Sequence, residues 1–401
     1  MNSSMLHLRD TDVASGGQPP RDRRRVTIVT ETWPPEVNGV AMTIHQLVDW
    51  LSRRHEVSLI RVRQRDDDRG ITLPGVTTRV MPSVPVPRYR ALRMGVPSTR
   101  ALKRLWQRER PDIVHVITEG PLGWSAIRAA NAAGIPVISD FHTNFHQYAS
   151  HYGMGLFRPI ALRYLRSLHN RTRLTLVPTR MLADDLEQAG FRGLDVLARG
   201  IDTERFSPRR RQETLRAHWG AGPDDPVLLM VSRIAPEKNL PLALKAFEQA
   251  RARTPGARMV VVGDGPARAS FAKAHPDVCF VGMQTGEPLA EHYASADIFV
   301  FPSLSETFGN VTLEAMASGL AVVAFDYAAA REHIVDGRNG RSVASTDAAA
   351  FVDTVAELAG DRLQAKRLGN AARETALAVD WKRICEQYES FLEQCVEAPN
   401  G

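Results

Sequence analysis

Two glutamates that lie eight residues apart are the first candidates for chemistry in this chain. Glu306 follows a short apolar run, and Glu314 lies one turn into a helix that Gly309 and Asn310 are expected to open. Main-chain N–H groups at this helix start would attract an anion. They belong to Thr307, Phe308 and Gly309. Because a carboxylate can accept from two hydroxyls at once, the segment favours a sugar nucleotide as ligand. The alternative is two acids that merely favour the helix dipole.

A pair of cations follows another apolar run. Arg233 and Lys238 lie five residues apart in one expected loop. Two such cations can converge on a diphosphate, where each charge-assisted hydrogen bond contributes about 1.5–3 kcal/mol. They can also neutralise the charge that develops on a leaving diphosphate. Taken alone, without further context, the pair favours a solvated, charged loop.

Glycines occupy three turns where a backbone could approach a ligand closely. Gly263 follows the run 258–262, Gly282 and Met283 follow the next run, and Gly39 precedes an amphipathic helical pattern. The turn at Gly263 lacks the third glycine of a dinucleotide fingerprint, which disfavours an NAD-dependent oxidoreductase. The alternatives are a tight strand-to-helix turn at Gly263 and an ordinary turn residue at Gly39.

Two segments could suggest a metal site, and neither has a convincing ligand set. His142 and His146 have i, i+4 spacing with His151 nearby, but the glutamate of an HExxH motif and an acidic third ligand are missing. Asp66–Asp68 are flanked by arginines, which favours a solvated charge cluster. We therefore predict no metal ligands.

The elements that position these residues alternate between short β-branched runs and helical patterns. The expected strands are 26–30, 57–62, 113–117, 136–139, 174–177 and 195–198, and then 227–231, 258–262, 278–281, 298–301 and 321–324. The last expected helices are 348–358, 362–376 and 381–394. Such alternation predicts an α/β fold with two successive doubly wound parallel sheets, Rossmann-like domains that face a cleft. The polar segment 199–211 would connect them, and ligands would bind beyond the carboxyl ends of the strands.

Composition limits the class of protein. The chain has 401 residues, of which 43% are hydrophobic and 24% charged, as in soluble proteins large enough for two cores. No apolar run approaches the roughly 18 residues of a membrane span. The N-terminal segment lacks the apolar region of a secretory signal. Three scattered cysteines (Cys279, Cys385 and Cys395) are consistent with a reducing cytoplasm.

The segment SETFGNVTLEAMASGLAVVA, residues 305–324, resembles the E-x7-E segment of family-4 retaining glycosyltransferases, which have the two-domain GT-B fold. The resemblance extends over nearly the whole chain beyond residue 25. It implies that Glu306 contacts the donor hexose and Glu314 the nucleotide ribose. The main chain of Thr307, Phe308 and Gly309 would then meet phosphate or sugar.

Further positions match the same family. Arg233 and Lys238 match its Arg-x4-Lys pair, which implies a catalytic role on the leaving diphosphate. The resemblance implies donor contacts at other positions. Gly39 would face the diphosphate, Gly263 would form a turn of the nucleotide domain, and Gly282 and Met283 would lie at the nucleobase. His142 would contact the sugar near the reacting centre. The family also implies transfer in which the departing phosphate oxygen assists deprotonation of the acceptor, so we expect no cofactor and no metal.

The chain divides into four parts. Residues 1–24 are polar and aperiodic, which predicts a disordered lead. The resemblance implies an acceptor-side domain at 25–200 and a nucleotide-sugar donor domain at 201–376. Residues 377–401 would form a C-terminal helix that crosses back to the N-terminal domain.

Charge is unevenly distributed. Residues 1–200 carry 29 basic and 18 acidic residues, a net charge of +11, whereas the rest carries −5. Basic residues lie beside apolar stripes in 88–110 and 151–173, a pattern typical of helices on anionic lipid. The alternative is amphipathic helices that face the core. No nucleic-acid-binding motif accompanies the charge.

Together these features predict a cytoplasmic enzyme, peripheral on the inner face of the plasma membrane. It would move a hexose, with mannose as the first candidate, from a GDP- or UDP-hexose to a hydroxyl of a lipid or glycan. The segments RGIDTERFSP, APEKN and DFHTNF resemble those of bacterial GDP-mannose-dependent α-mannosyltransferases and glycolipid glycosyltransferases. The alternatives are a UDP-sugar-dependent diacylglycerol glycosyltransferase, a sugar-nucleotide epimerase and a non-catalytic sugar-nucleotide sensor.

Overall fold

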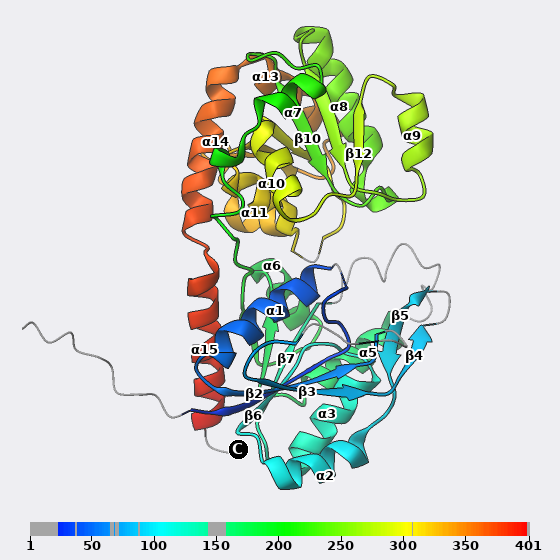
Figure 1. Ribbon diagram of the computed structural model, residues 1–401, viewed down its shortest axis with the longest axis vertical. Helices are drawn as coiled ribbons and strands as arrows, with labels where there is room; N and C mark the ends of the chain where they lie inside the picture. Colours follow the sequence, from blue (N-terminus) through cyan, green and yellow to red (C-terminus); the bar gives the residue numbers. More distant parts are fainter. Residues whose placement is uncertain are drawn as a thin grey trace, which may run out of the picture.

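The computed structural model describes residues 23–36, 38–64, 68, 72–86, 89–142, 158–306 and 308–398. Nearly all of the expected disordered lead lies outside these residues, as do Thr307, His146 and His151. The described chain forms two lobes, the N-terminal one below and the C-terminal one above in Figure 1.

The N-terminal lobe is built on a seven-stranded parallel sheet with the order β3-β2-β1-β6-β7-β8-β9. Its strands are β1 (Arg25–Thr30), β2 (Glu56–Val62), β3 (Val76–Met81), β6 (Ile113–Val116), β7 (Val137–Asp140), β8 (Leu174–Val177) and β9 (Leu194–Val196). Its helices are α1 (Gly39–Ser52), α2 (Thr99–Glu109), α3 (Pro121–Ala132), α5 (Arg158–His169) and α6 (Arg180–Gln188). A two-stranded antiparallel hairpin, β4 (Ser83–Val86) and β5 (Tyr89–Gly95), projects from it. The central strands are buried along their whole length because helices cover both faces.

The C-terminal lobe repeats this plan with six parallel strands in the order β12-β11-β10-β13-β14-β15. They are β10 (Val227–Val231), β11 (Arg258–Val262), β12 (Cys279–Gly282), β13 (Ile298–Phe301), β14 (Ala321–Phe325) and β15 (Arg341–Val343). The helices are α7 (Glu213–His218), α8 (Leu240–Arg253), α9 (Arg268–Ala274), α10 (Gly286–Ser295), α11 (Asn310–Ala317), α12 (Ala329–His333), α13 (Ala348–Gly360) and α14 (Arg362–Leu377). Two 3₁₀ turns, η1 (Pro208–Arg210) and η2 (Pro236–Lys238), complete it.

The order of strands confirms the expected doubly wound α/β fold. Two strands of the parallel sheets that the sequence does not predict, β3 and β15, lie at sheet edges, and the hairpin strands β4 and β5 are not predicted either. Strands β3 and β15 are only partly buried, so neither shows the continuous apolar run that marks a central parallel strand. At the other edge of the N-terminal sheet, β9 ends at Val196, two residues before its expected end.

The last helix, α15 (Trp381–Glu397), lies along the N-terminal lobe and contacts α1, β6 and β7 (Figure 1). The chain therefore passes between the lobes twice, and the two passages lie side by side. Ile201 on the first passage forms a parallel bridge with Asp380 on the second. Gly200 packs against Trp381 so closely that an added Cβ would lie 2.7 Å from its ring. The segment 199–211, which the sequence predicts as a polar connection between the domains, carries two buried apolar residues, Ile201 and Phe206.

Candidate active site

Lys238 and Glu306 meet at the carboxyl edge of the C-terminal sheet. Lys238 ends η2 in the loop after β10, and Glu306 lies in the loop after β13, the neighbouring strand. The Lys238 Nζ forms an ion pair with Glu306 Oε1 and lies 3.3 Å from the carbonyl oxygen of Ser305. The Ser303 hydroxyl donates to the same carboxylate oxygen at 2.9 Å. Parallel strands thus bring together a cation and an acid that are distant in sequence.

Arg233, the second expected cation, points elsewhere in this structure. Its side chain is 69% exposed, and its guanidinium forms an ion pair with Glu237 at 2.8 Å, within its own loop. An exposed guanidinium can change rotamer at little cost because water still solvates it. Its expected contact with a diphosphate stays a prediction that this geometry does not display.

Glu314 lies one turn into α11, as expected, and is held by a tyrosine. The Tyr293 hydroxyl, from α10, donates to Glu314 Oε2 at 2.8 Å. Burial raises the pKa of Glu314 to about 7, and the hydrogen bond from Tyr293 offsets only part of that rise. A carboxylate poised near neutrality can change its protonation state when a polar ligand arrives.

Between the two glutamates, the chain turns sharply into α11. Gly309 has φ +89°, in the left-handed region that favours glycine, and α11 begins at the next residue. The Phe308 side chain is buried in the C-terminal core, so only its main chain is available to a ligand. Thr307 lies outside the described residues.

The glycines on the nucleotide side serve turns. Gly263 has φ +133°, and a Cβ there would lie 1.8 Å from the carbonyl oxygen of Ser232, so the turn after β11 itself requires glycine. Its N–H donates to the Gly282 carbonyl at 2.8 Å. Met283, directly after β12, is 58% exposed and offers an apolar surface at the position expected for the nucleobase. The nucleotide contacts of all three residues stay predictions.

His142 lies two residues beyond the end of β7, lines a small cavity with Arg199, and is anchored by Asp140. Its Nε2 donates to Asp140 Oδ2 at 3.2 Å, and the other Asp140 oxygen accepts from His115 Nε2 at 2.7 Å. His115 Nδ1 in turn lies 2.6 Å from the hydroxyl of Tyr388 on α15. Burial alone would raise the pKa of Asp140, but the two histidines outweigh it and hold that pKa well below its usual range.

Arg199 and Gly39 connect the two halves of the site. Gly39 begins α1, after Asn38, whose side chain caps the helix by accepting from the N–H of Ala41. A Cβ added at Gly39 would lie 2.6 Å from Arg199 Nη1. The same Nη1 donates to Asn310 Oδ1, at the start of α11 in the other lobe, at 3.2 Å. One side chain therefore touches the N-terminal ends of two helices, one from each lobe.

Several residues of this site are absent from the sequence prediction. His115 lies inside a strand, and Tyr388 lies in an amphipathic helix more than 270 residues later. Asp140 and Arg199 directly follow two expected strands of the first half, 136–139 and 195–198, and this position is the usable signal for both.

The acidic run 66–68 differs from the solvated cluster that the sequence predicts. The Asp68 side chain is only 3% exposed and accepts from both terminal nitrogens of buried Arg61, at 2.6 and 3.2 Å. The main-chain N–H of Gln64 donates to the same carboxylate at 2.7 Å. The sequence reading missed this pair because Arg61 sits within β2, where a charge is tolerated only with a buried partner. Asp66 and Asp67 lie outside the described residues.

Comparisons with known proteins agree with this geometry. Residues 37–205 match the model of Glycosyltransferase Family 4, and residues 211–375 match that of Glycosyl transferases group 1. A GDP-mannose-dependent alpha-mannosyltransferase of Mycobacterium tuberculosis is 34% identical over 368 residues, which span 90% of this chain and 94% of that protein. The chain belongs to glycosyltransferase family 4. An alpha-monoglucosyldiacylglycerol synthase of Streptococcus pneumoniae is 30% identical over 75% of this chain and 70% of its own length.

The fold of this glycosyltransferase is the GT-B fold. The solved structure of sucrose-phosphate synthase from Thermosynechococcus elongatus superposes with a TM-score of 0.75 at 18% identity, covering 93% of this chain and 99% of that one. The expected fold class is thereby confirmed.

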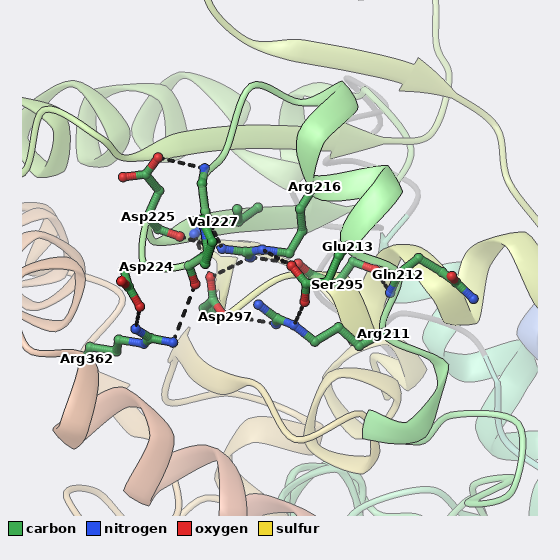
Figure 2. A network of polar contacts seen from close by, with 12 residues as sticks. Arg211, Gln212, Glu213, Arg216, Asp224, Asp225, Val227, Ser295, Asp297 and Arg362 are labelled. Atoms are coloured by element: carbon green, nitrogen blue, oxygen red, sulfur yellow. Dashed lines mark hydrogen bonds and ion pairs between the residues drawn. The ribbon is translucent and has the colours of Figure 1, made fainter.

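A second polar network of the glycosyltransferase lies at the amino ends of the same strands (Figure 2). Buried Arg216 on α7 donates to Asp297 Oδ2 and to the Ser295 carbonyl, both at 2.9 Å. Asp297 also accepts from the N–H of Val227 at 2.8 Å, and Arg211 reaches its other oxygen at 3.2 Å. This network ties α7, β10 and β13 together at the edge of the sheet away from Lys238 and Glu306, so its role is structural.

Proposed function

We propose that this enzyme transfers mannose, with retention, from GDP-mannose to a hydroxyl of a lipid-linked acceptor, without a metal ion. The observation that carries the proposal is the pairing of Lys238 with Glu306 at the carboxyl edge of the donor-side sheet. It joins a cation suited to a diphosphate and an acid suited to sugar hydroxyls in one place. The name of the M. tuberculosis relative supports GDP-mannose as the donor.

Each side chain then has a defined task. Lys238, with Arg233 after a rotamer change, neutralises the charge that develops on the leaving diphosphate, so positive charge comes from the protein itself. Glu306 accepts from the hexose hydroxyls. His142, held by Asp140, contacts the sugar from the opposite lobe, and the departing phosphate oxygen takes the acceptor proton.

On the ribose side, Glu314 accepts from the two ribose hydroxyls. Tyr293 keeps one of its oxygens in place. These contacts position the donor but take no part in bond breaking, so they contribute to the affinity for the nucleotide as a whole.

The N-terminal lobe carries a surface suited to a membrane. On α5, Ile160 is 65% and Tyr164 40% exposed, with exposed Arg163 between them, while Leu165 and Leu168 face the core. Apolar side chains beside a cation fit an anionic lipid surface. We propose that α5 places the enzyme on the cytoplasmic face of the membrane. In α2, by contrast, Leu102 and Trp106 are buried, so its apolar stripe faces the core. No helix within the described ranges has the length and hydropathy needed to cross a bilayer.

A UDP-sugar-dependent transfer to diacylglycerol is the second candidate, favoured by the name of the S. pneumoniae relative. One experiment distinguishes these proposed functions. Purified enzyme is incubated in EDTA with GDP-mannose or UDP-hexoses and with vesicles that contain diacylglycerol or glycosylated diacylglycerol. We expect a mannosylated lipid from GDP-mannose. Product formed from a UDP-hexose but not from GDP-mannose would favour the second candidate. Interconversion of the free donor would indicate an epimerase, and nucleotide-sugar binding without turnover would indicate a sensor.

A further inference from the structure

Arg199 is a buried arginine at the junction of the two lobes. It lies three residues beyond the end of β9, at the start of the first passage between the lobes. The residue is only 7% exposed. It lines a small cavity together with Asp140 and His142, at the carboxyl edge of the N-terminal sheet. A charged side chain in this place has lost most of its hydration, so its charge requires compensation.

The nearby acids are already engaged. Burial lowers the pKa of the Arg199 guanidinium to about 10, and the charges of Asp140 and Glu306 offset only part of that effect. Asp140 accepts from His115 and His142, and Glu306 is paired with Lys238. Among the described residues, Arg199 forms no direct ion pair, and its side-chain hydrogen bond goes to the neutral amide of Asn310.

Helix dipoles add to the positive field. Arg199 touches Gly39 at the start of α1, a helix of 14 residues, and Asn310 at the start of α11. A helix N-terminus carries roughly half a positive charge, so a cation is disfavoured beside it and an anion favoured. Asn38 accepts from the N–H groups of Ala41, through its side chain, and of Met42, through its carbonyl. The preceding N–H groups, those of Gly39 and Val40, have no acceptor within the described residues.

The acids near Arg199 indicate which part of the donor this side chain would contact. Arg199 is electrostatically coupled to Glu306, the acid proposed to hold the hexose. Glu314, the acid proposed for the ribose, lies one turn deeper in α11 and is bound to Tyr293. Arg199 therefore belongs to the hexose end of the site, where the phosphate attached to the sugar lies.

We propose that Arg199 is a further donor-binding residue, which contacts the β-phosphate of the nucleoside-diphosphate sugar across the interlobe crevice. The inference rests on the proposed function, because it takes a nucleoside-diphosphate sugar as the ligand. The β-phosphate becomes the leaving group's terminal phosphate, so its charge rises as the sugar departs. A buried guanidinium at that position stabilises the departing charge strongly because little water screens it.

Nucleotide affinities test the assignment. The dissociation constants of GDP and GMP are measured by titration calorimetry for the wild type, Arg199→Gln and Arg199→Lys. Glutamine still offers a hydrogen bond to Asn310 but carries no charge, so we expect GDP affinity to fall about ten- to hundredfold. Lysine keeps the charge but loses the planar fork, so a loss of about three- to tenfold is expected. GMP, which lacks the β-phosphate, should change less than about twofold in both variants.

Arg205→Met is the matched control. Arg205 lies in the same passage, but its side chain is 43% exposed and pairs with Asp202 at 3.7 Å, so neither nucleotide should be affected. If GDP and GMP lose affinity equally, or if neither changes, Arg199 has only a structural role and the inference is wrong. If circular dichroism shows that the Arg199→Gln variant is unfolded, the ratio of GDP to GMP affinity in the Arg199→Lys variant, compared with the wild type, tests the inference instead. Failure of the wild type to prefer GDP or UDP over the monophosphates would instead overturn the proposed function.

Discussion

Lys238 and Glu306 form an ion pair although they are 68 residues apart in the chain. Neighbouring parallel strands, β10 and β13, bring them to one edge of the sheet, and the Ser303 hydroxyl donates to the same oxygen of Glu306. The cation is therefore positioned before a donor arrives. Such preorganisation is what electrostatic stabilisation of a leaving group requires.

Loss of the lysine should reduce turnover far more than binding. We expect Lys238→Met to lower kcat by about a hundred- to thousandfold, because leaving-group charge is no longer neutralised. Glu306→Gln should cause a similar loss. Since the two side chains contact each other, the double variant should lose much less than the product of the single effects. Steady-state kinetics measure this, with exposed Lys245→Met as a control that retains activity. Purely multiplicative losses would show that the pair does not act as a unit.

Glu314 should give nucleotide binding a dependence on pH. Its raised pKa, about 7, means that the acid is mostly protonated at pH 6 and mostly ionised at pH 8. Only the ionised form accepts from both ribose hydroxyls, so GDP affinity should rise about five- to tenfold across that interval. The Glu314→Gln variant should bind GDP weakly, and its affinity should lack the pH dependence that Glu314 contributes. Ionisation of GDP itself affects both proteins equally, so it cancels when they are compared. Parallel pH profiles for the two proteins would contradict the assignment.

Much of this arrangement could be predicted from sequence. Buried parallel strands leave continuous apolar runs, so the central strands of both sheets and the loops after them could be located. That placed Glu306, Lys238 and Glu314 correctly on their elements. The rotamer of Arg233 could not be predicted, because an exposed guanidinium responds to a local partner, here Glu237, that any loop could supply.

The anchoring of His142 should affect catalysis. Asp140→Asn removes the negative charge that orients His142 and His115, so we expect kcat to fall about ten- to hundredfold. Tyr388→Phe leaves that charge but removes a buried hydrogen bond, so a smaller loss of kcat is expected, with about 1–3 kcal/mol less stability. Ser390→Ala, on the exposed face of α15, is the control. An unchanged kcat in Asp140→Asn would assign the network to folding alone.

This network explains why the rest of the site escaped prediction. His115 and Asp140 meet because β6 and β7 are neighbouring strands. Tyr388 reaches His115 only because α15 returns to the first lobe, and no local spacing indicates a contact between residues 115 and 388. The same holds for Arg199, whose partners Gly39 and Asn310 belong to different lobes. Contacts of this kind follow from tertiary packing and not from the period of a single element.

The network in Figure 2 should govern stability rather than activity. Arg216→Met leaves Asp297 without its buried partner, so we expect the C-terminal lobe to lose about 3–5 kcal/mol of unfolding free energy. Arg211→Met removes a half-exposed contact to the same acid and should cost less than about 1 kcal/mol. Denaturant unfolding measures both. GDP affinity of the folded variants should be unchanged, and a selective loss of GDP binding would contradict a structural role.

Membrane association should depend on α5. We expect Ile160→Glu to weaken binding to anionic vesicles by about tenfold or more, since it places a negative charge on the proposed contact surface. Turnover of a water-soluble acceptor should be unaffected. Leu363→Glu, at a residue that is 82% exposed on α14, is the matched control. Equal vesicle binding by all three proteins would exclude α5 as the contact surface.

A crystal structure of the enzyme with GDP would show whether Lys238 and Glu306 form the donor site. We expect the diphosphate at the carboxyl edge of the C-terminal sheet, with a phosphate oxygen within about 3.2 Å of Lys238 Nζ. The ribose hydroxyls should lie against Glu314. A nucleotide bound elsewhere, or one whose diphosphate faces away from Lys238 and Glu306, would show that this pair is not the donor site.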